Sequence, residues 1–196
     1  MSDPALALLE FDSISAGIVA GDAMVKTAPI AAIYAGTVHP GRFLVMVSGD
    51  TASVEIAHDI GIAVGSLTDS VFLPDIHPDV TAAIVRGSTG AGLSAEALGI
   101  VETASAAAAI DAADAGVKAA DVTVSSVRLS DGLGGKGYVL FSGVVAEVEA
   151  AVESAVSRVA PHGTLVRSDV VPQLHADMAA NLSAEPRFMR RVEAGI

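Results

Sequence analysis

The sequence predicts an α+β chain, an α/β sandwich in which two tandem units each fold into a sheet covered by helices on one face. Three observations predict this: the chain repeats itself, each repeat alternates apolar runs with helix-periodic segments, and the order is the same in both. Residues 5–28 align with 97–120 at a constant offset of 92, which becomes 94 after a two-residue insertion. We therefore predict a first domain at 4–93, a second at 94–183 and a C-terminal tail at 184–196.

Each unit opens on a short apolar run, Ala5–Leu9 or Ala97–Val101, which is typical of a buried strand. A helix is predicted next, and Ser13 and Ser105 stand where an N-cap residue is needed. Apolar residues at helical spacing should turn one face of that helix towards the core. These residues are Ile14, Ile18 and Val25 in the first unit, and Ile110 and Val117 in the second.

A strand pair and a second helix follow in each unit. The strands are predicted at Ile30–Ala35 with Phe43–Val47, and at Val122–Leu129 with Tyr138–Phe141. The second helix is indicated by apolar residues spaced between Val54 and Val64, and again between Val148 and Val159. A final strand and a short histidine-containing segment close each unit. The resulting order, β-α-β-β-α-β, is that of a ferredoxin-like sandwich, whose open sheet face normally packs against another subunit.

The closing segments carry one histidine each, His77 after Pro74 and His175 after Pro172, at equivalent places in the repeat. Because two diverged copies keep the same residue there, we predict a structural hydrogen bond for both. Glu10 and Glu102 likewise close the first strand of each unit. No nucleophile or oxyanion donor is predicted beside them, so capping or subunit contacts are the favoured interpretation.

The charge, apolar stretches and cysteine content of the chain exclude several classes of partner and chemistry. The 196 residues hold 11 Lys and Arg against 23 Asp and Glu, a formal charge of −12, which disfavours nucleic acid and anionic membrane surfaces. No apolar stretch reaches the roughly 18–20 residues of a membrane span, and the N-terminus has no signal core. With no cysteine, the chain has neither disulfides nor thiolate nucleophiles. We expect a cytoplasmic protein that binds neither nucleic acid nor membrane.

A glycine-rich loop at Gly132–Gly137 satisfies the G-x-G-x-x-G pattern of dinucleotide-binding sites. That chemistry requires the loop to open a helix, whose N-terminus binds the pyrophosphate. Here the loop leads into the predicted strand Tyr138–Phe141. We therefore interpret these glycines as a turn where backbone can approach backbone around a symmetry axis.

The repeat also carries a family resemblance. The stretches ALGIVET at 97–103, AIDAADAGVKAADV at 109–122 and GLGGKGY at 132–138 resemble the bacterial microcompartment (BMC) shell domain. The first unit is similar but more diverged, with GDAMVKTAP at 21–29 and GTVHPGRF at 36–43. Both copies have the non-permuted order, and the whole resembles tandem shell proteins of the propanediol-utilisation type.

The resemblance implies a homotrimer that imitates a hexamer and tiles, with other shell proteins, into facets around a set of enclosed enzymes. It implies a central pore through which metabolites pass, and it implies no enzymatic activity. Lys26 and Lys118 match the lysine at the tile edge. The residues matching the two pore loops are Val38, His39, Pro40, Gly41, Asp131, Gly132, Leu133, Gly134, Gly135 and Lys136.

His39 is the one candidate metal ligand. Some tandem members of the family hold an iron–sulfur cluster on a pore cysteine, and His39 stands at the matching position in this cysteine-free chain. Three copies around one axis could bind zinc or a similar ion. The alternative is a plain pore-lining histidine, whose charge would change near neutral pH. No other cofactor is expected.

A function of another class stays open at this point. A trimeric ferredoxin-like regulatory protein could bind a nucleotide or metabolite between its subunits. Such a protein would remain a discrete particle and would gain thermal stability from its ligand, whereas a shell tile would form sheets.

Overall fold

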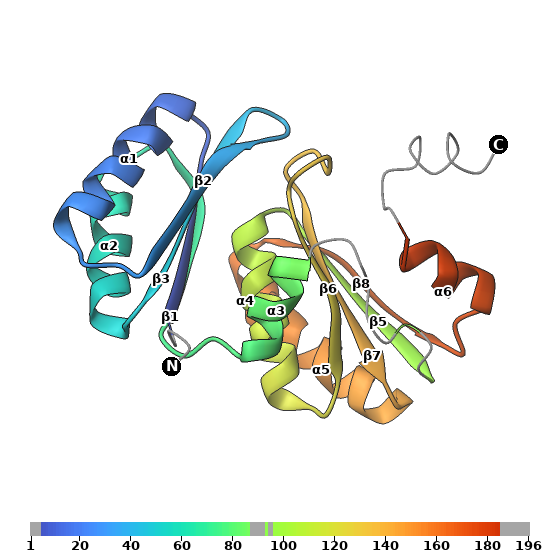
Figure 1. Cartoon of the computed structure of the whole chain (residues 1–196). Coiled ribbons are helices and arrows are strands. Elements are labelled where there is room, and N and C mark those ends of the chain that lie inside the picture. The colour runs from blue at the N-terminus through green and yellow to red at the C-terminus, as the bar shows by residue number, and fades with distance from the viewer. Residues whose placement is uncertain (1–4, 87–92, 94–95, 185–196) are drawn as a thin grey trace.

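The computed structural model describes residues 5–86, 93 and 96–184 (Figure 1). The first unit comprises β1 (Ala5–Phe11), α1 (Ile14–Thr27), β2 (Ala32–Val38), β3 (Arg42–Gly49), α2 (Thr51–Ala63), β4 (Leu67–Leu73) and α3 (Pro78–Arg86). The second comprises β5 (Ala97–Thr103), α4 (Ala106–Ala119), β6 (Thr123–Leu129), β7 (Gly137–Gly143), α5 (Val145–Val159), the 3₁₀ turn η1 (Ala160–His162), β8 (Leu165–Pro172) and α6 (Ala176–Leu182). The predicted tail falls almost wholly outside the described residues. Within them, no helix is both long and apolar enough to cross a membrane.

The two sheets have the same topology. Their strand orders are β2-β3-β1-β4 and β6-β7-β5-β8, and the paired strands are antiparallel throughout. One irregularity is shared, since the pairing to the edge strand shifts register directly after Glu10 in β1 and after Glu102 in β5. Another is not, since β6 shifts register against β7 between Val124 and Ser126, whereas β2 pairs regularly with β3. This is the ferredoxin-like arrangement, so the predicted fold class is confirmed.

Two helices were missing from the predicted plan, α3 and α6, each beginning directly after the repeated histidine. In both units the histidine Nδ1 accepts a hydrogen bond from the backbone N–H two residues further on, Asp79 in one case and Asp177 in the other, at 3.2 Å. The predicted structural role of His77 and His175 is thereby confirmed: they satisfy amide groups that the first turn of a helix leaves unpaired.

The predicted core face of α1 is wrong. Ile14, Ile18 and Val25 are 43%, 56% and 43% exposed, and the residues that face the sheet are Gly17, Ala20, Gly21 and Met24. Small residues occupy the face towards the sheet because the helix lies close to it. A Cβ on Gly17 would come within 2.5 Å of the Phe43 ring. Helix α1 therefore has a second apolar face, directed away from its own sheet.

The equivalent helix α4 is buried on both faces. Ile110 and Val117 are 0% and 8% exposed, as predicted for the second unit. The reason lies in the neighbouring unit, because α4 packs against β4 and β1 as well as against its own strands. Helix α3 packs in turn against β6 (Figure 1), and one of the hydrophobic cores contains residues of both units. We call this contact region the junction: α4 with β1 and β4, and α3 with β6.

Candidate functional site

The two turns predicted as pore loops lie next to each other at one end of the sheets (Figure 1). Arg42 at the start of β3 donates from Nη1 to the carbonyl oxygen of Gly135 at 3.3 Å. The Nδ1 atom of His39 lies 3.8 Å from Oδ1 of Asp131, and both side chains are exposed. The structure thus brings the predicted residues of both units together, while their lining of a pore stays a prediction.

The glycines of the second turn take the conformation that the sequence favours. Gly132, Gly134 and Gly135 all have positive φ angles, at 74°, 64° and 90°, and a side chain would be strained there. Gly135 is also crowded, since an added Cβ would lie 3.1 Å from the guanidinium carbon of Arg42. The loop joins strand β6 to strand β7, so it is not the strand-to-helix turn of a dinucleotide site.

Behind each turn, a glutamate pairs with a cation. The Oε2 atom of Glu10, which is fully buried, lies 3.4 Å from Nη1 of Arg42, and Oε1 accepts the backbone N–H of Ala107 in the first turn of α4 at 2.7 Å. Burial raises the pKa of the Glu10 carboxyl, and the hydrogen bond from Ala107 opposes that rise. The second unit repeats the pair as Glu102 with Lys136 at 2.6 Å, but Glu102 is partly exposed. Glu10 therefore links Arg42, which follows the turn at His39, to the junction.

The predicted tile-edge lysines differ in their partners. Lys118 lies 2.7 Å from Oδ2 of Asp114 and donates to the carbonyl oxygen of Asp75 in the other unit. Oδ1 of Asp114 accepts the backbone N–H of His77 at 2.8 Å. Lys26 makes the corresponding pair with Asp22 at 2.6 Å, yet both side chains are well exposed. The second-unit pair thus joins the two units, and a role at a tile edge stays a prediction for both lysines.

Metal ligands do not gather in the part of the chain that the structure describes. Across the described residues, no group of three or more His, Asp or Glu side chains is placed to hold an ion. A metal site at His39 would need the same residue from other chains, so it too stays a prediction.

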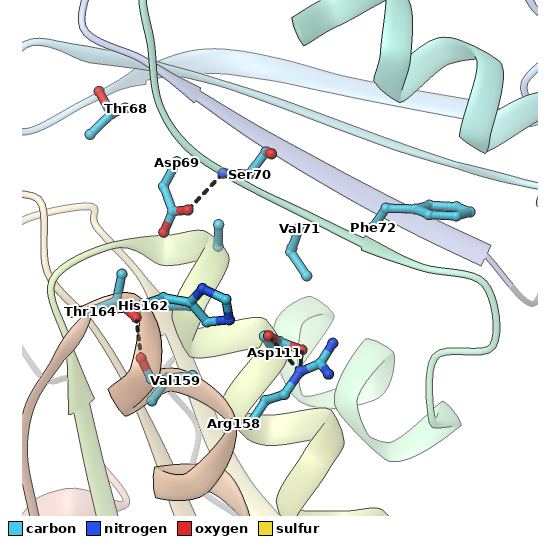
Figure 2. Close-up of a pocket in the computed structure, with 12 residues that line it drawn as sticks. Thr68, Asp69, Ser70, Val71, Phe72, Asp111, Arg158, Val159, His162 and Thr164 are labelled. Atoms are coloured by element: carbon cyan, nitrogen blue, oxygen red, sulfur yellow. Dashed lines mark hydrogen bonds and ion pairs between the residues drawn. The ribbon is translucent and has the colours of Figure 1, made fainter.

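Sequence reasoning missed a polar cluster at the junction. Nε of Arg158 on α5 donates to both carboxylate oxygens of Asp111 on α4 at 2.9 Å, and His162 of η1 lies beside them (Figure 2). The signal was present in the repeat, because the equivalent first-unit positions are Val19 and Val64. The second unit therefore carries a charged pair, Asp111 with Arg158, where the first unit carries two valines.

The BMC domain model matches this chain twice, over residues 5–76 and 97–174. The chain is 41% identical over 180 residues to the bacterial microcompartment shell protein PduT of Citrobacter freundii, covering 89% of this chain and 95% of that protein. The shell protein PduA of the same organism is 37% identical over 91 residues, which is 44% of this chain and 98% of PduA. The crystal structure of a microcompartment protein from Desulfitobacterium hafniense has a TM-score of 0.78 and 36% identity, covering 90% of this chain and 98% of its own.

Proposed function

The chain belongs to the BMC domain family and is a structural shell protein of a bacterial microcompartment, and on this premise we propose that three copies close head to tail into a tile with a pseudohexagonal outline. The tile would lie in a shell facet within the cytoplasm, beside other shell proteins and around enclosed enzymes. The family is structural, and we expect the tile itself to catalyse no reaction. The shell-protein relatives favour this function over the regulatory protein that the sequence left open.

The observation that supports the ring is the junction inside the chain. There the open face of the first sheet is buried, with Leu6, Leu8 and Leu73 each at most 5% exposed. That face shares a hydrophobic core with α3 and α4. One unit of the repeat therefore buries its sheet by contacting the first helix of the next.

The counterpart of one contacting surface is exposed, and the counterpart of the other is partly covered. Leu98 and Leu140 of the second sheet are 2% and 4% exposed, in a cluster against which Leu182 of α6 packs. Helix α1 presents the exposed face that α4 buries, and strand β2 presents Tyr34, which is 64% exposed, where β6 is mostly buried. The open face of the second sheet forms an apolar groove of about 590 Å³, which we call the second-sheet groove. Its lining residues are Leu98, Ile100, Glu102, Tyr138, Leu140, Val171, Leu174, Met178 and Leu182.

The exposed face of α1 and the second-sheet groove belong to different units of the repeat, and both are apolar. A contact between unlike surfaces generates either a closed ring or an open filament. If the second unit of one chain meets α1 of the next as the first unit meets α4, each chain continues the same repeat. Six units, from three chains, would then surround one axis.

The repeat also predicts individual contacts of that interface. Glu102 would accept the backbone N–H of Ser15 of the partner subunit, as Glu10 accepts that of Ala107. Lys26 would donate to the carbonyl oxygen of Gln173 of the partner subunit, as Lys118 donates to that of Asp75. The side chain of Arg167 would lie at Ser13 of the partner subunit, because the equivalent residues Asp69 and Ser105 are hydrogen bonded.

The same ring would bring the turns at His39 and Gly134 around the axis three times each. We propose that they line a pore for small metabolites, with charged groups at its rim supplied by His39, Asp131 and Lys136. The edges near Lys26 and Lys118 would meet neighbouring tiles. A metal ion held by three His39 side chains belongs to the same proposal and would be detected as metal that copurifies with the trimer.

Cysteine cross-linking tests the ring cleanly, because the natural chain has no cysteine. The variant Ser13→Cys/Arg167→Cys should form disulfides between chains and run as a covalent trimer without reductant. The matched control, Asp69→Cys/Ser105→Cys, places cysteines at the equivalent positions of one chain and should leave it monomeric on the same gel. A ladder extending beyond three chains, or no cross-link at all, would contradict the closed ring.

Negative-stain electron microscopy tests the tile separately from the ring. Purified protein over a range of concentration and salt should form sheets with a hexagonal lattice. Covalent trimers that never form a lattice, alone or with other shell proteins, would leave the ring but refute the tile.

A further inference from the structure

A pocket of about 370 Å³ opens to solvent beside the junction, between the edge strand β4 of the first unit and α4, α5 and η1 of the second (Figure 2). The side chain of Arg158 in it is 56% exposed. Its size suits a small ligand. It is lined by Thr68, Asp69, Ser70, Val71, Phe72, Ala107, Ala108, Asp111, Arg158, Val159, His162 and Thr164. We call it the junction cavity, and neither the pore nor the tile edges use it.

One end of the junction cavity offers donors for a carboxylate. Arg158 contacts Asp111 through Nε alone, so within the described contacts its two Nη groups remain to bind a second acid. Guanidinium presents a planar fork that fits a carboxylate with two parallel hydrogen bonds. The imidazole of His162 lies between this pair and Asp69 in Figure 2, where it can donate to the same ligand group.

The other end offers acceptors for an ammonium group. Oδ1 of Asp69 accepts the backbone N–H of Ser70 at 2.8 Å, and Oδ2 accepts the hydroxyl of Ser105. Each carboxylate oxygen can accept a second hydrogen bond. Glu10 stands directly opposite Asp69 in the pairing of β1 with β4, and its own carboxyl is paired with Arg42.

Along one side, the wall between the two ends is apolar. The methyl side chains of Ala107 and Ala108 and the buried side chain of Val71 leave room for a short alkyl group there but offer it no polar partner. The cavity therefore has acceptors at Asp69, donors at Arg158 and His162, and a short apolar wall along one side.

The balance of charge in the lining favours a ligand that carries both signs. Asp69 and Asp111 are opposed by Arg158, and by His162 when it is protonated. A free anion would face two carboxylates, and a free cation would face the guanidinium. A molecule with an ammonium at one end and a carboxylate at the other meets an opposite charge at each.

The first unit shows that the fold does not need these charges. At the positions equivalent to Asp111 and Arg158 it carries Val19 and Val64, so the counterpart cavity of the proposed ring would lack both. We propose that the junction cavity binds a small zwitterion of the free amino acid type, once in each chain. The inference does not rest on the ring, because every lining residue belongs to one chain.

Isothermal titration with three matched probes tests the proposal: alanine, ethylamine, which lacks the carboxylate, and propionate, which lacks the ammonium. Alanine should bind at least about tenfold more tightly than either half-molecule, since each loses a charge-assisted hydrogen bond. Serine, which adds one hydroxyl beside Ser70, serves as a second zwitterion. Failure of both amino acids to bind at millimolar concentration, or equal binding of propionate or ethylamine, would overturn the proposal.

The roles of Asp111 and Arg158 are tested by replacing them with the residues that stand at the equivalent positions of the first unit. Asp111→Val/Arg158→Val imports the first-unit pair, so the chain should remain folded, with an unchanged melting temperature within a few degrees, and lose alanine binding. Arg158→Gln should weaken alanine binding by at least about tenfold. Glu55→Gln, on an exposed surface of α2 outside the cavity, should bind alanine normally. Undiminished binding by the folded valine double variant would show that the ligand binds elsewhere.

Discussion

Helices α1 and α4 are the same element of the repeat, yet they differ in burial. Ile18 of α1 is 56% exposed, and its counterpart Ile110 of α4 is fully buried. Each helix is capped by a serine at its start and carries a lysine in its last turn, so their local sequences do not explain the difference. What differs is the neighbour: α4 has another unit packed against its outer face. In the proposed ring, the exposed face of α1 is where the repeat would continue into another chain.

The largest effect on stability should come from truncating the side chains of the matched pair Ile110 and Ile18. Ile110→Ala should lower the free energy of unfolding by about 2–5 kcal/mol, because it leaves a cavity in the common core. Ile18→Ala should cost less than about 0.5 kcal/mol in a separate chain, where the side chain is exposed, and should instead weaken association. Urea unfolding at several protein concentrations distinguishes the two.

In that experiment, the loss caused by Ile110→Ala should not depend on protein concentration. The loss caused by Ile18→Ala should grow as the wild type associates, because binding to the folded state adds stability by mass action. An equal loss of unfolding free energy for both variants in a dilute monomer would contradict the difference in burial between α1 and α4.

A second difference concerns where each unit places its aromatic core residue. Phe43 packs beneath Gly17, near the start of α1, whereas Phe141 packs beneath Gly116, near the end of α4. The first-unit counterparts of Gly116 and Phe141 are Met24 and Val47, both fully buried. The two units therefore fill the same space with a large helix residue in one case and a large strand residue in the other.

Exchanging that pair should reveal coupling. Gly116→Met alone should destabilise the fold by about 1–3 kcal/mol through overpacking against Phe141, and Phe141→Val alone should leave a void. The double variant Gly116→Met/Phe141→Val restores the first-unit combination. Its loss should be smaller than the sum of the two single losses by about 0.5–3 kcal/mol. Thermal and urea unfolding measure this, and strict additivity would mean that the two positions do not share one space.

The smallest expected effect is the pH dependence that Glu10 adds. Burial raises the pKa of Glu10, so the folded chain holds this proton more tightly than the unfolded chain does. The contribution of Glu10 to stability is therefore complete below the ordinary carboxyl range and is lost as pH rises through the raised pKa.

Glu10→Gln, which still can accept the N–H of Ala107, should flatten this part of the stability curve. Urea unfolding in steps from pH 4 to pH 8 measures the slope. Glu102→Gln, in the partly exposed second-unit pair, is the matched comparison and should change the slope less. A steeper loss of stability in the Glu10→Gln variant would contradict the assignment.

The sequence alone determined the parts of this protein that depend on local pattern and on repetition. The offset of 92 identified two equivalent units, and strand and helix periods within each unit predicted the element order of a ferredoxin-like sandwich, because these periods depend on residues that are close in the chain. The glycines before Tyr138 predicted a strand-to-strand turn, and the repeated histidines predicted a structural hydrogen bond. These features need no information from distant residues.

Tertiary structure decided what depends on which surfaces meet. Helix α1 has two apolar faces, and the close approach allowed by Gly17 assigned the sheet to the face with smaller residues. The contact of Lys118 with Asp75 and the burial of Glu10 against Ala107 arise only when α4 packs across the first sheet. The junction cavity exists for the same reason: Asp69 and Arg158 are far apart in the chain, and only the docking of one unit on the other places them around a common space.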